Sequence, residues 1–402
     1  MTARAAYRRV LVVGAWSGHE NLGDELLAEL VIGAVRQAQP RAEVRLVTDN
    51  AHAARERWGV DACEWRDGLL RPLAWAHCVV APLATLPYHY PPRVIWLLER
   101  ARLLRRPTLA LGVGAAAPVG WPAATVARMA RALCHATLIT TRDEESRAYL
   151  AQIAVRAPME VTADPVVDVT ADGADIGWLW RELPWSAAET RPFLAAAMRH
   201  ARGEASVPAP AQLAAALDYL AKAHDLPTLF VPMHAAPGAD SHYHAQVLMQ
   251  MRRRDMAHVL FTALSGPETV QLFGRAQLVV ASRLHALILA GCAGAPVLGI
   301  ARAPKIEAYL ARVGAAVLPG SPTPSTEQLL AGIELQLSRV DSERARTRTA
   351  NRAMRASNAR NWEALTEFLH RRLRRHGSSL GDAARLPPPA EDRPGASATE
   401  HS

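Results

Sequence analysis

The chain has 402 residues, of which 50% are apolar and 21% are charged. This balance excludes a disordered chain, and the length allows two domains with separate hydrophobic cores. No apolar run reaches the roughly 18 residues of a membrane-spanning helix, and residues 1–9 lack the profile of a signal peptide. We therefore expect a cytoplasmic protein.

The net charge of +8 and the isoelectric point of 9.8 would be typical of a nucleic-acid-binding protein if the positive charge were spread over the domains. Residues 344–376 contain ten arginines and two glutamates, so this one segment carries a charge equal to the whole excess. Neither of the preceding domains is therefore strongly basic. We expect a helix here that docks by its apolar stripe, with an arginine face that is either solvated or in contact with anionic lipid.

Apolar strands and helices alternate along the first part of the chain, which predicts a mainly parallel sheet covered on both faces. The expected strands are 9–15, 43–48, 77–81, 108–113 and 137–141, and the expected helices are 24–37, 93–105 and 123–135. After Asp164-Pro165 the pattern loosens into a tryptophan-rich connector. We assign residues 1–185 to an N-terminal Rossmann-like domain.

The segment from Gly14 to Glu25 follows the first strand, but its glycine spacing fits neither the dinucleotide nor the P-loop pattern. Its three carboxylates would repel a phosphate at the start of the helix. We therefore expect a neutral polyhydroxyl ligand here, hydrogen-bonded by Asn21 and Asp24. The alternative is that Asp24 only caps the helix and the glycines only make the turn.

A second alternating series predicts a second parallel sheet. Its expected strands are 193–198, 228–231, 258–263, 278–281 and 297–300, and its expected helices are 211–224, 242–252, 267–275, 284–293 and 305–313. We assign residues 186–340 to a C-terminal Rossmann-like domain, 341–376 to the basic helix, and 377–402 to a disordered tail rich in Pro, Ala and Ser. The predicted fold is α/β, with two Rossmann-like domains facing a cleft.

Ser282-Arg283-Leu284-His285 marks the point where an apolar strand gives way to a helix. A helix start exposes unpaired N–H groups, so an arginine and an imidazole there make a site for a small anion beside a proton donor. Arginine can also grip a carboxylate or phosphate through two parallel hydrogen bonds. The alternative is that Arg283 pairs locally and His285 is a core histidine.

Two further cations fall where they can reach the same anion. Lys305, one of only two lysines beside 44 arginines, follows the strand next along the chain from Arg283. Arg142 ends a strand of the first domain and would act from across the cleft. The alternatives are a solvated lysine at a helix start and a surface ion pair between Arg142 and its neighbouring carboxylates.

The sequence predicts no metal site. The four cysteines are far apart, form no Cys-x-x-Cys pair and are expected to be buried thiols. Among the histidines, His234, His242 and His244 are close in sequence, but two residues apart on a helix do not share a face and no carboxylate completes a ligand set.

Six motifs, in the same order, resemble the polysaccharide pyruvyltransferase family, in particular the bacterial enzymes that pyruvylate secondary cell-wall polymers. They are Gly14–Glu25, Thr141–Ser146, Thr162–Pro165, Leu264–Glu268, Ser282–Leu287 and Pro304-Lys305, over about residues 8 to 315. Two segments depart from the family pattern. Ala81-Pro82-Leu83 replaces a glycine triplet, and only Gly112-Val113-Gly114 and Pro118 remain of a glycine-rich loop.

The resemblance implies a GT-B-like fold with the acceptor on the N-terminal domain and the donor on the C-terminal domain. It implies transfer of pyruvate from phosphoenolpyruvate to two hydroxyls of one sugar, which forms a ketal. The acceptor would be a glycan of a cell-wall or exopolysaccharide precursor, typically lipid-linked in this family, so the enzyme would work in the cytoplasm or at the inner face of the membrane. Phosphoenolpyruvate is a co-substrate, and no metal or organic cofactor is implied.

The resemblance places Arg283 and His285, together with Arg142 and Lys305, at the donor, and the chemistry of the residues themselves suggests the following roles. His285 would protonate the methylene carbon of the donor, and Asp24 would accept the proton of the attacking hydroxyl. The donor-binding cations would be Arg283, Lys305 and Arg142, and the acceptor-binding residues would be Asn21, Gly18 and Gly23. Two alternative functions stay open: a nucleotide-sugar glycosyltransferase or epimerase of the same shape, and a non-enzymatic protein that binds nucleic acid through the arginine helix.

Overall fold

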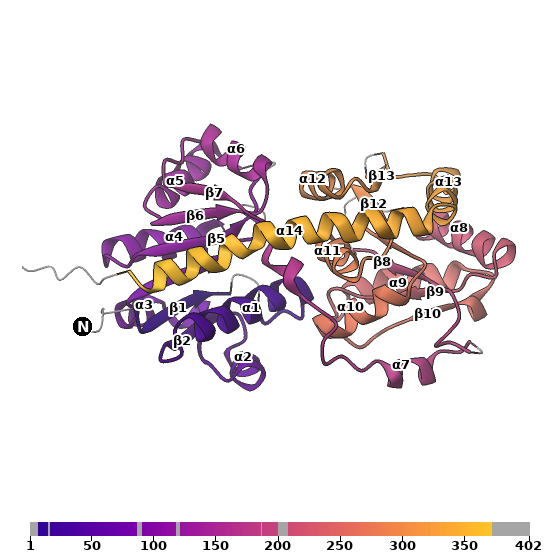
Figure 1. Ribbon diagram of the computed structural model, residues 1–402, viewed down its shortest axis with the longest axis horizontal. Helices are drawn as coiled ribbons and strands as arrows, with labels where there is room; N and C mark the ends of the chain where they lie inside the picture. The colour runs from indigo at the N-terminus through magenta and orange to yellow at the C-terminus, as the bar shows by residue number, and fades with distance from the viewer. Residues whose placement is uncertain are drawn as a thin grey trace, which may run out of the picture.

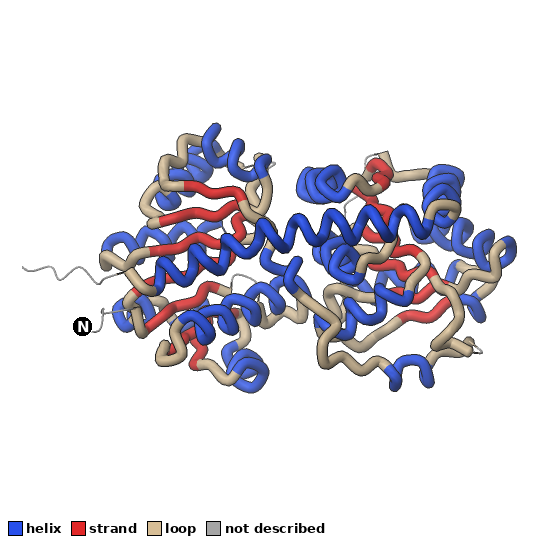
Figure 2. Tube along the Cα trace, viewed as in Figure 1, coloured by secondary structure: helices blue, strands red, loops and turns tan. Residues whose placement is uncertain are grey.

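The computed structural model describes residues 7–14, 17–86, 91–117, 121–185, 187–199, 208–301, 303–320 and 322–371. Figures 1 and 2 show two α/β domains side by side, each built on a sheet with helices packed around it. Among the described residues, neighbouring strands of both sheets pair in parallel. The prediction of two Rossmann-like domains is confirmed. The expected disordered tail, 377–402, lies outside the described residues.

The N-terminal domain holds a seven-stranded sheet in the order β3-β2-β1-β4-β5-β6-β7. Its strands are β1 Arg9–Val13, β2 Glu43–Thr48, β3 Asp61–Glu64, β4 Cys78–Pro82, β5 Thr108–Val113, β6 Leu138–Thr141 and β7 Met159–Val161. Its helices are α1 Leu22–Ala38, α2 Ala51–Trp58, α3 Leu70–Trp75, α4 Pro91–Leu103, α5 Ala123–Leu133 and α6 Glu144–Gln152, with 3-10 turns η1 Trp65–Asp67 and η2 Pro165–Asp168. The sequence did not predict the edge strands β3 and β7, because both are short and partly exposed.

The C-terminal domain holds a six-stranded sheet in the order β10-β9-β8-β11-β12-β13. Its strands are β8 Leu194–Ala197, β9 Thr228–Phe230, β10 Ala257–Val259, β11 Leu278–Ala281, β12 Val297–Ala301 and β13 Ala316–Pro319. Its helices are α8 Pro210–Ala223, α9 Asp240–Gln250, α10 Gly266–Arg275, α11 Leu284–Ala293, α12 Pro304–Val313 and α13 Thr326–Leu337, with the 3-10 turn η3 Arg254–Met256. The short helix α7 Gly177–Glu182 lies beside this domain (Figure 1), although it falls within residues 1–185, which the sequence assigned to the N-terminal domain.

Alternation along the strands divides the core between the two faces of each sheet. In β1, Leu11 and Val13 pack in one cluster, while Val10 and Val12 pack in another. Successive side chains of a strand point to opposite faces, so a strand that is apolar at every position is covered on both sides. Of the cysteines expected to be buried thiols, all are free, but only Cys78 is fully buried.

The strand order of both sheets places the candidate site. The order reverses between β1 and β4 in the first sheet and between β8 and β11 in the second. Chain segments leave neighbouring strands toward opposite faces at such a point, which opens a crevice beyond the carboxyl ends of the strands. The loop from β1 into α1 and the turn from β11 into α11 both begin at these crevices.

A 30-residue helix, α14 (Val340–Leu369), crosses both domains (Figure 1). Its apolar end, Leu365, Phe368 and Leu369, is buried in a cluster with strands β1, β4 and β5, whereas Met354 packs with the C-terminal domain. The expected stripe therefore docks, and the helix joins the two domains. Among the described helices, none combines the length and the hydropathy that a membrane span requires.

The arginines of α14 are mostly used inside the molecule. Arg344 donates to the carbonyls of Gly274 and Ala276, Arg355 donates to the carbonyl of Asp168, and Arg360 pairs with Glu160 and Glu367. Arg348, Arg352 and Arg371 are the exposed arginines in the described part of segment 344–376. A fully solvated arginine face was therefore the wrong expectation, since these cations fasten the helix to both domains.

Candidate active site

The candidate residues lie at the ends of strands and the starts of helices on both sides of the domain boundary. Asn21 and Asp24 begin α1, Arg142 follows β6, Asp164 precedes η2, Arg283 and His285 begin α11, and Lys305 begins α12. Each position follows from parallel α/β connectivity, in which the loop after a strand leads into the helix that covers the sheet.

Gly23 and His285 bring the two domains into direct contact. A Cβ atom built on Gly23 would lie 1.8 Å from Nδ1 of His285 and 2.3 Å from its Cγ. Only a residue without a side chain fits there, because the imidazole ring lies against the backbone of α1. Gly23 was predicted to contact the acceptor; the structure places it against the histidine of the opposite domain.

Asn21 belongs to a short antiparallel bridge between the domains. Asn21 pairs with His234, and the Leu22 amide donates to the Met233 carbonyl at 2.9 Å. The Asn21 side chain donates to Oδ2 of Asp24 at 2.6 Å. Asn21, and not Asp24, occupies the N-cap of α1, so the alternative that Asp24 merely caps the helix was wrong.

Asp24 is the carboxylate best suited to accept a proton. Its burial raises its pKa from 3.8 to about 7, although the nearby ammonium of Lys305 acts in the opposite direction. A carboxyl group with a pKa near the working pH is matched to general base catalysis.

Gly18, another predicted acceptor contact, closes the loop before α1. Its backbone has φ +95°, and its amide donates to Oε1 of buried Glu25 at 2.6 Å. A side chain on Gly18 would collide with the backbone of Asn50. The described contacts of this glycine are those of a turn that shapes the loop.

Arg283 is held by a carboxylate that the sequence did not reveal. Its Nε donates to Oδ2 of Asp240 at 3.0 Å, and its Nη2 donates to Oδ1. Asp240 is 0% exposed and also accepts the amides of Met233 and His234. Arg283 therefore has a carboxylate partner, but one 43 residues away and not the local one of the alternative. A guanidinium has five N–H donors, and two bonds do not exhaust them.

His285 and Asp164 face each other without a hydrogen bond. Nε2 of His285 lies 3.8 Å from Oδ2 of Asp164, and both atoms are buried without a hydrogen-bond partner among the described residues. Burial lowers the pKa of His285 to about 4; Asp164 opposes this shift, and the surrounding cations add to it. The ligand-free protein therefore holds the imidazole neutral near pH 7, whereas the predicted role requires a proton on it.

Arg142 is not on the surface. Its side chain is 7% exposed, donates from Nη1 to the Ala84 carbonyl at 2.7 Å and from Nε to Asp143 at 3.1 Å. The same Nη1 lies 3.7 Å from Oδ2 of Asp164. A Cβ on Gly114 would lie 2.5 Å from the guanidinium carbon, so the remaining glycine loop makes room for this arginine. The alternative of an ion pair with an adjacent carboxylate is therefore correct for Asp143, but the pair is buried and not on the surface.

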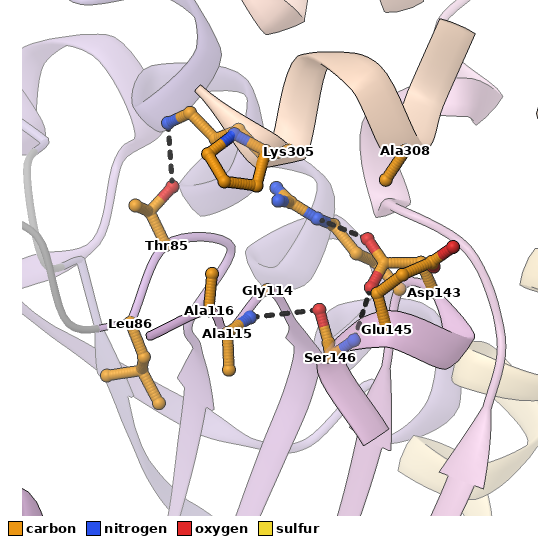
Figure 3. Close-up of a pocket in the computed structure, with 12 residues that line it drawn as sticks. Thr85, Leu86, Gly114, Ala115, Ala116, Asp143, Glu145, Ser146, Lys305 and Ala308 are labelled. Atoms are coloured by element: carbon orange, nitrogen blue, oxygen red, sulfur yellow. Dashed lines mark hydrogen bonds and ion pairs between the residues drawn. The ribbon is translucent and has the colours of Figure 1, made fainter. Parts of the chain in front are cut away.

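Lys305 reaches across the domain boundary into a pocket that Arg142 also lines (Figure 3). Its Nζ lies 3.4 Å from Oγ1 of Thr85, at the opposite wall. Burial, reinforced by the charge of Arg142, lowers the pKa of Lys305 to about 7. The alternative of a solvated lysine was wrong, since two cations from different domains meet at one pocket.

Three further residues complete the arrangement. Asp164 belongs to the Thr162–Pro165 motif, whereas Asp240 gave no sequence signal beyond its place at the start of a helix. Arg312 of α12 donates to the carbonyls of Arg142, at 2.7 Å, and of Thr162, at 3.1 Å, which ties the two domains beside the pocket. Within the described ranges, no group of three or more His, Cys, Asp and Glu side chains is placed to hold a metal ion.

Solved structures with the same architecture are GT-B-fold enzymes. Anabaena HepE in complex with UDP-glucose has a TM-score of 0.62 and 13% identity, over 89% of this chain and 99% of that one. The UDP-GlcNAc 2-epimerase of Neisseria meningitidis bound to UDP-GlcNAc has a TM-score of 0.64 and 11% identity, over 90% and 99%. At these identities the likeness shows the fold alone, and it confirms the predicted GT-B-like class.

Sequence comparison is more specific. A search of curated proteins finds no match. The family model described as polysaccharide pyruvyl transferase matches residues 21–304, which is more than half of the chain. The chain therefore belongs to the polysaccharide pyruvyl transferase family.

Proposed function

We propose that this protein transfers the pyruvyl group of phosphoenolpyruvate to two hydroxyls of one sugar and forms a ketal. The observation that carries the proposal, besides membership of a transferase family, is the meeting of Arg142 and Lys305 at one pocket, near His285 and Asp24. Phosphoenolpyruvate carries a carboxylate and a phosphate on three carbons. A compact anion of this kind needs closely spaced cations and a proton donor.

In the first half of the reaction, imidazolium His285 gives its proton to the methylene carbon of the donor. The neighbouring carbon becomes an oxocarbenium centre, and one sugar hydroxyl adds to it. Asp24 accepts the proton of that hydroxyl. Bound phosphoenolpyruvate itself favours the protonated imidazole that the first step needs. Its negative charge beside the ring raises the pKa of His285 from the low value of the ligand-free site.

In the second half, the bond between the same carbon and the phosphate oxygen breaks, and phosphate leaves with the bonding electrons. Arg142, Arg283 and Lys305 stabilise the departing charge. Phosphate takes the proton held by Asp24 and leaves as hydrogen phosphate. The second hydroxyl then closes the ketal ring, and its proton restores the imidazolium. No electrons are transferred to or from an outside group.

For the acceptor, we propose a glycan of a cell-wall or exopolysaccharide precursor, bound at the loop before α1. The carboxylates of this loop disfavour a phosphate and suit hydroxyl groups. A lipid-linked acceptor would bring the enzyme to the inner face of the membrane, where Arg348, Arg352 and Arg371 are the exposed cations in the described part of segment 344–376. Co-sedimentation with anionic vesicles at low salt tests this contact, and charge reversal of the three arginines should abolish it.

The decisive experiment incubates the protein with phosphoenolpyruvate and candidate glycans. Expected results are release of inorganic phosphate and a mass gain on the glycan equal to pyruvic acid less one water. His285→Ala should abolish both while the melting temperature is retained. HepE and the epimerase were solved with nucleotide sugars, so a UDP-sugar is the second ligand to test. Thermal stabilisation by a UDP-sugar and not by phosphoenolpyruvate would contradict the proposal.

A further inference from the structure

We propose that Asp164 is a positioning residue for His285: the Asp164 carboxylate orients the imidazole ring and stabilises its protonated form. This inference rests on the proposed function, because it concerns the proton that the transfer reaction uses. The observation behind it is the pair of buried atoms, Oδ2 of Asp164 and Nε2 of His285, that face each other at 3.8 Å while neither has a hydrogen-bond partner among the described residues.

Two unsatisfied buried polar atoms cost free energy, about 1–3 kcal/mol for each group, and a folded protein rarely keeps them without a reason. An N–H···O bond requires a separation of about 2.7–3.2 Å, so a shift of less than about 1 Å would join these atoms. A neutral ring with its hydrogen on Nδ1 has no hydrogen to offer at Nε2. Protonation supplies one, and the contact becomes a charge-assisted hydrogen bond.

The carboxylate is held in place for this task. Oδ1 of Asp164 accepts the amide of Val166 at 3.1 Å and so caps η2. That turn packs on α11, the helix that carries His285, and Sγ of Cys292 lies 3.3 Å from the carbonyl of Val167. Asp164 and His285 therefore sit on two elements that pack as one unit, which is the arrangement expected of a positioning partner.

The charges around the imidazole show why a carboxylate is needed. Lys305 from α12, Arg142 from the end of β6 and Arg283 from the start of α11 all disfavour an imidazolium, while Asp164 favours it. From α1, Gly23 lies against the ring, and Asp24 follows it. A carboxylate only 3.7 Å from Arg142 also works against binding of an anionic donor. Donor binding alone gives no reason for Asp164, whereas a proton on His285 does.

Asp164→Asn is the informative variant because it retains Oδ1 as the cap of η2 and removes only the charge. We expect the alkaline limb of the kcat/KM profile, which reports loss of the imidazolium, to move to lower pH by about one unit. The KM for phosphoenolpyruvate should stay constant or fall, since a negative charge has left the donor site, while kcat falls. A merely structural residue would not separate kcat from KM or shift the profile.

Asp168→Asn is the matched control, because Asp168 lies on the same turn but contacts Asn358 and Trp362 of α14 instead of the imidazole. This control should leave the pH profile unchanged. A second measurement does not depend on activity: nitrogen chemical shifts of labelled histidine, with His285→Gln to assign the signal, report the titration of this ring in the ligand-free protein. The signal should titrate at lower pH in Asp164→Asn than in the wild type.

Identical titration of His285 in the wild type and in Asp164→Asn would overturn the inference. If phosphoenolpyruvate fails to bind, the proposed function fails, yet the ligand-free titration still decides whether the two side chains form a pair. The two failures are therefore distinguishable.

Discussion

The backbone of Gly23 touches the imidazole of His285, so that the third residue of the Asn21-Leu22-Gly23-Asp24 motif in one domain sets the position of the histidine in the other. This contact explains two motifs at once. It places Asp24, the next residue along α1, beside the domain boundary, and it requires glycine at position 23. Because Gly23 has no side chain, helix α1 on the acceptor side can lie directly against the histidine on the donor side.

Gly23→Ala should therefore disable the site. The added methyl group has no space, because Nδ1 would lie 1.8 Å from it, and either the ring or the domain contact must move. We expect kcat/KM to fall by at least about 100-fold, as a displacement of about 1 Å in a catalytic group can do. Gly33→Ala on the same helix is the control, since a Cβ there meets nothing within 4 Å. It should keep full activity and gain about 0.5–1 kcal/mol in the free energy of unfolding.

Asp240→Ala tests the support of Arg283. Removal of this buried carboxylate leaves a half-buried guanidinium and two backbone amides without their acceptor. Breaking such a pair destabilises a protein by about 3–5 kcal/mol, and the KM for phosphoenolpyruvate should rise as Arg283 loses its orientation. Asp255→Ala removes an exposed partner of Arg253 and should leave the melting temperature and KM unchanged. An unaltered KM in Asp240→Ala would separate Arg283 from donor binding.

Asp24→Asn tests the raised pKa of Asp24. The folded-state pKa of about 7 lies above the ordinary value of 3.8, so the folded protein binds the proton more tightly than the unfolded chain does. The free energy of unfolding therefore declines as pH rises from about 4 to about 7, and the loss is complete above this window. The variant, which has no such charge, should be more stable than the wild type at pH 8, by an amount on the order of 4 kcal/mol, and no more stable at pH 4. Urea unfolding at both pH values measures this difference, and turnover should be lost at both.

Lys305→Arg tests the second cation. Because the pKa of Lys305 is lowered to about 7, the ammonium is lost as pH rises through that value in the ligand-free protein. Affinity for phosphoenolpyruvate should weaken between pH 6.5 and pH 8.5, on the order of tenfold, in the wild type but not in the arginine variant, which stays charged. Isothermal titration calorimetry measures the affinity of both proteins for phosphoenolpyruvate at each pH. Protonation of the ligand affects both proteins equally and so cancels in the comparison. Parallel pH profiles would show that Lys305 does not bind the donor in its charged form.

The sequence predicted those elements whose structure depends on residues close together along the chain. Alternating apolar segments predicted most strands and helices, and the turns after β1 and β11 were found because a strand, a glycine or a cation, and a helix follow one another directly. The short edge strands β3 and β7 were not predicted, because they gain most of their stability from pairing with a neighbour instead of from their own residues.

Long-range contacts account for what was missed. Asp240 lies 43 residues from Arg283, and no periodic pattern connects a helix start with a distant guanidinium. The alternative of a surface ion pair for Arg142 arose because three carboxylates follow it in the sequence, yet packing against Gly114 and the Ala84 carbonyl buries this side chain. Arg312 holds the domain boundary through backbone carbonyls, which carry no sequence signature at all.

By itself, the sequence determined the two-domain α/β class, the motifs at the switch points and membership of a transferase family, since these depend on neighbours along the chain. The tertiary structure alone decided that His285 rests on Gly23 and faces Asp164, that Arg142 is buried, and that the arginines of α14 fasten the domains together. The physical reason is that burial and charge proximity set the protonation and the partners of a side chain, and both arise only when distant segments pack against each other.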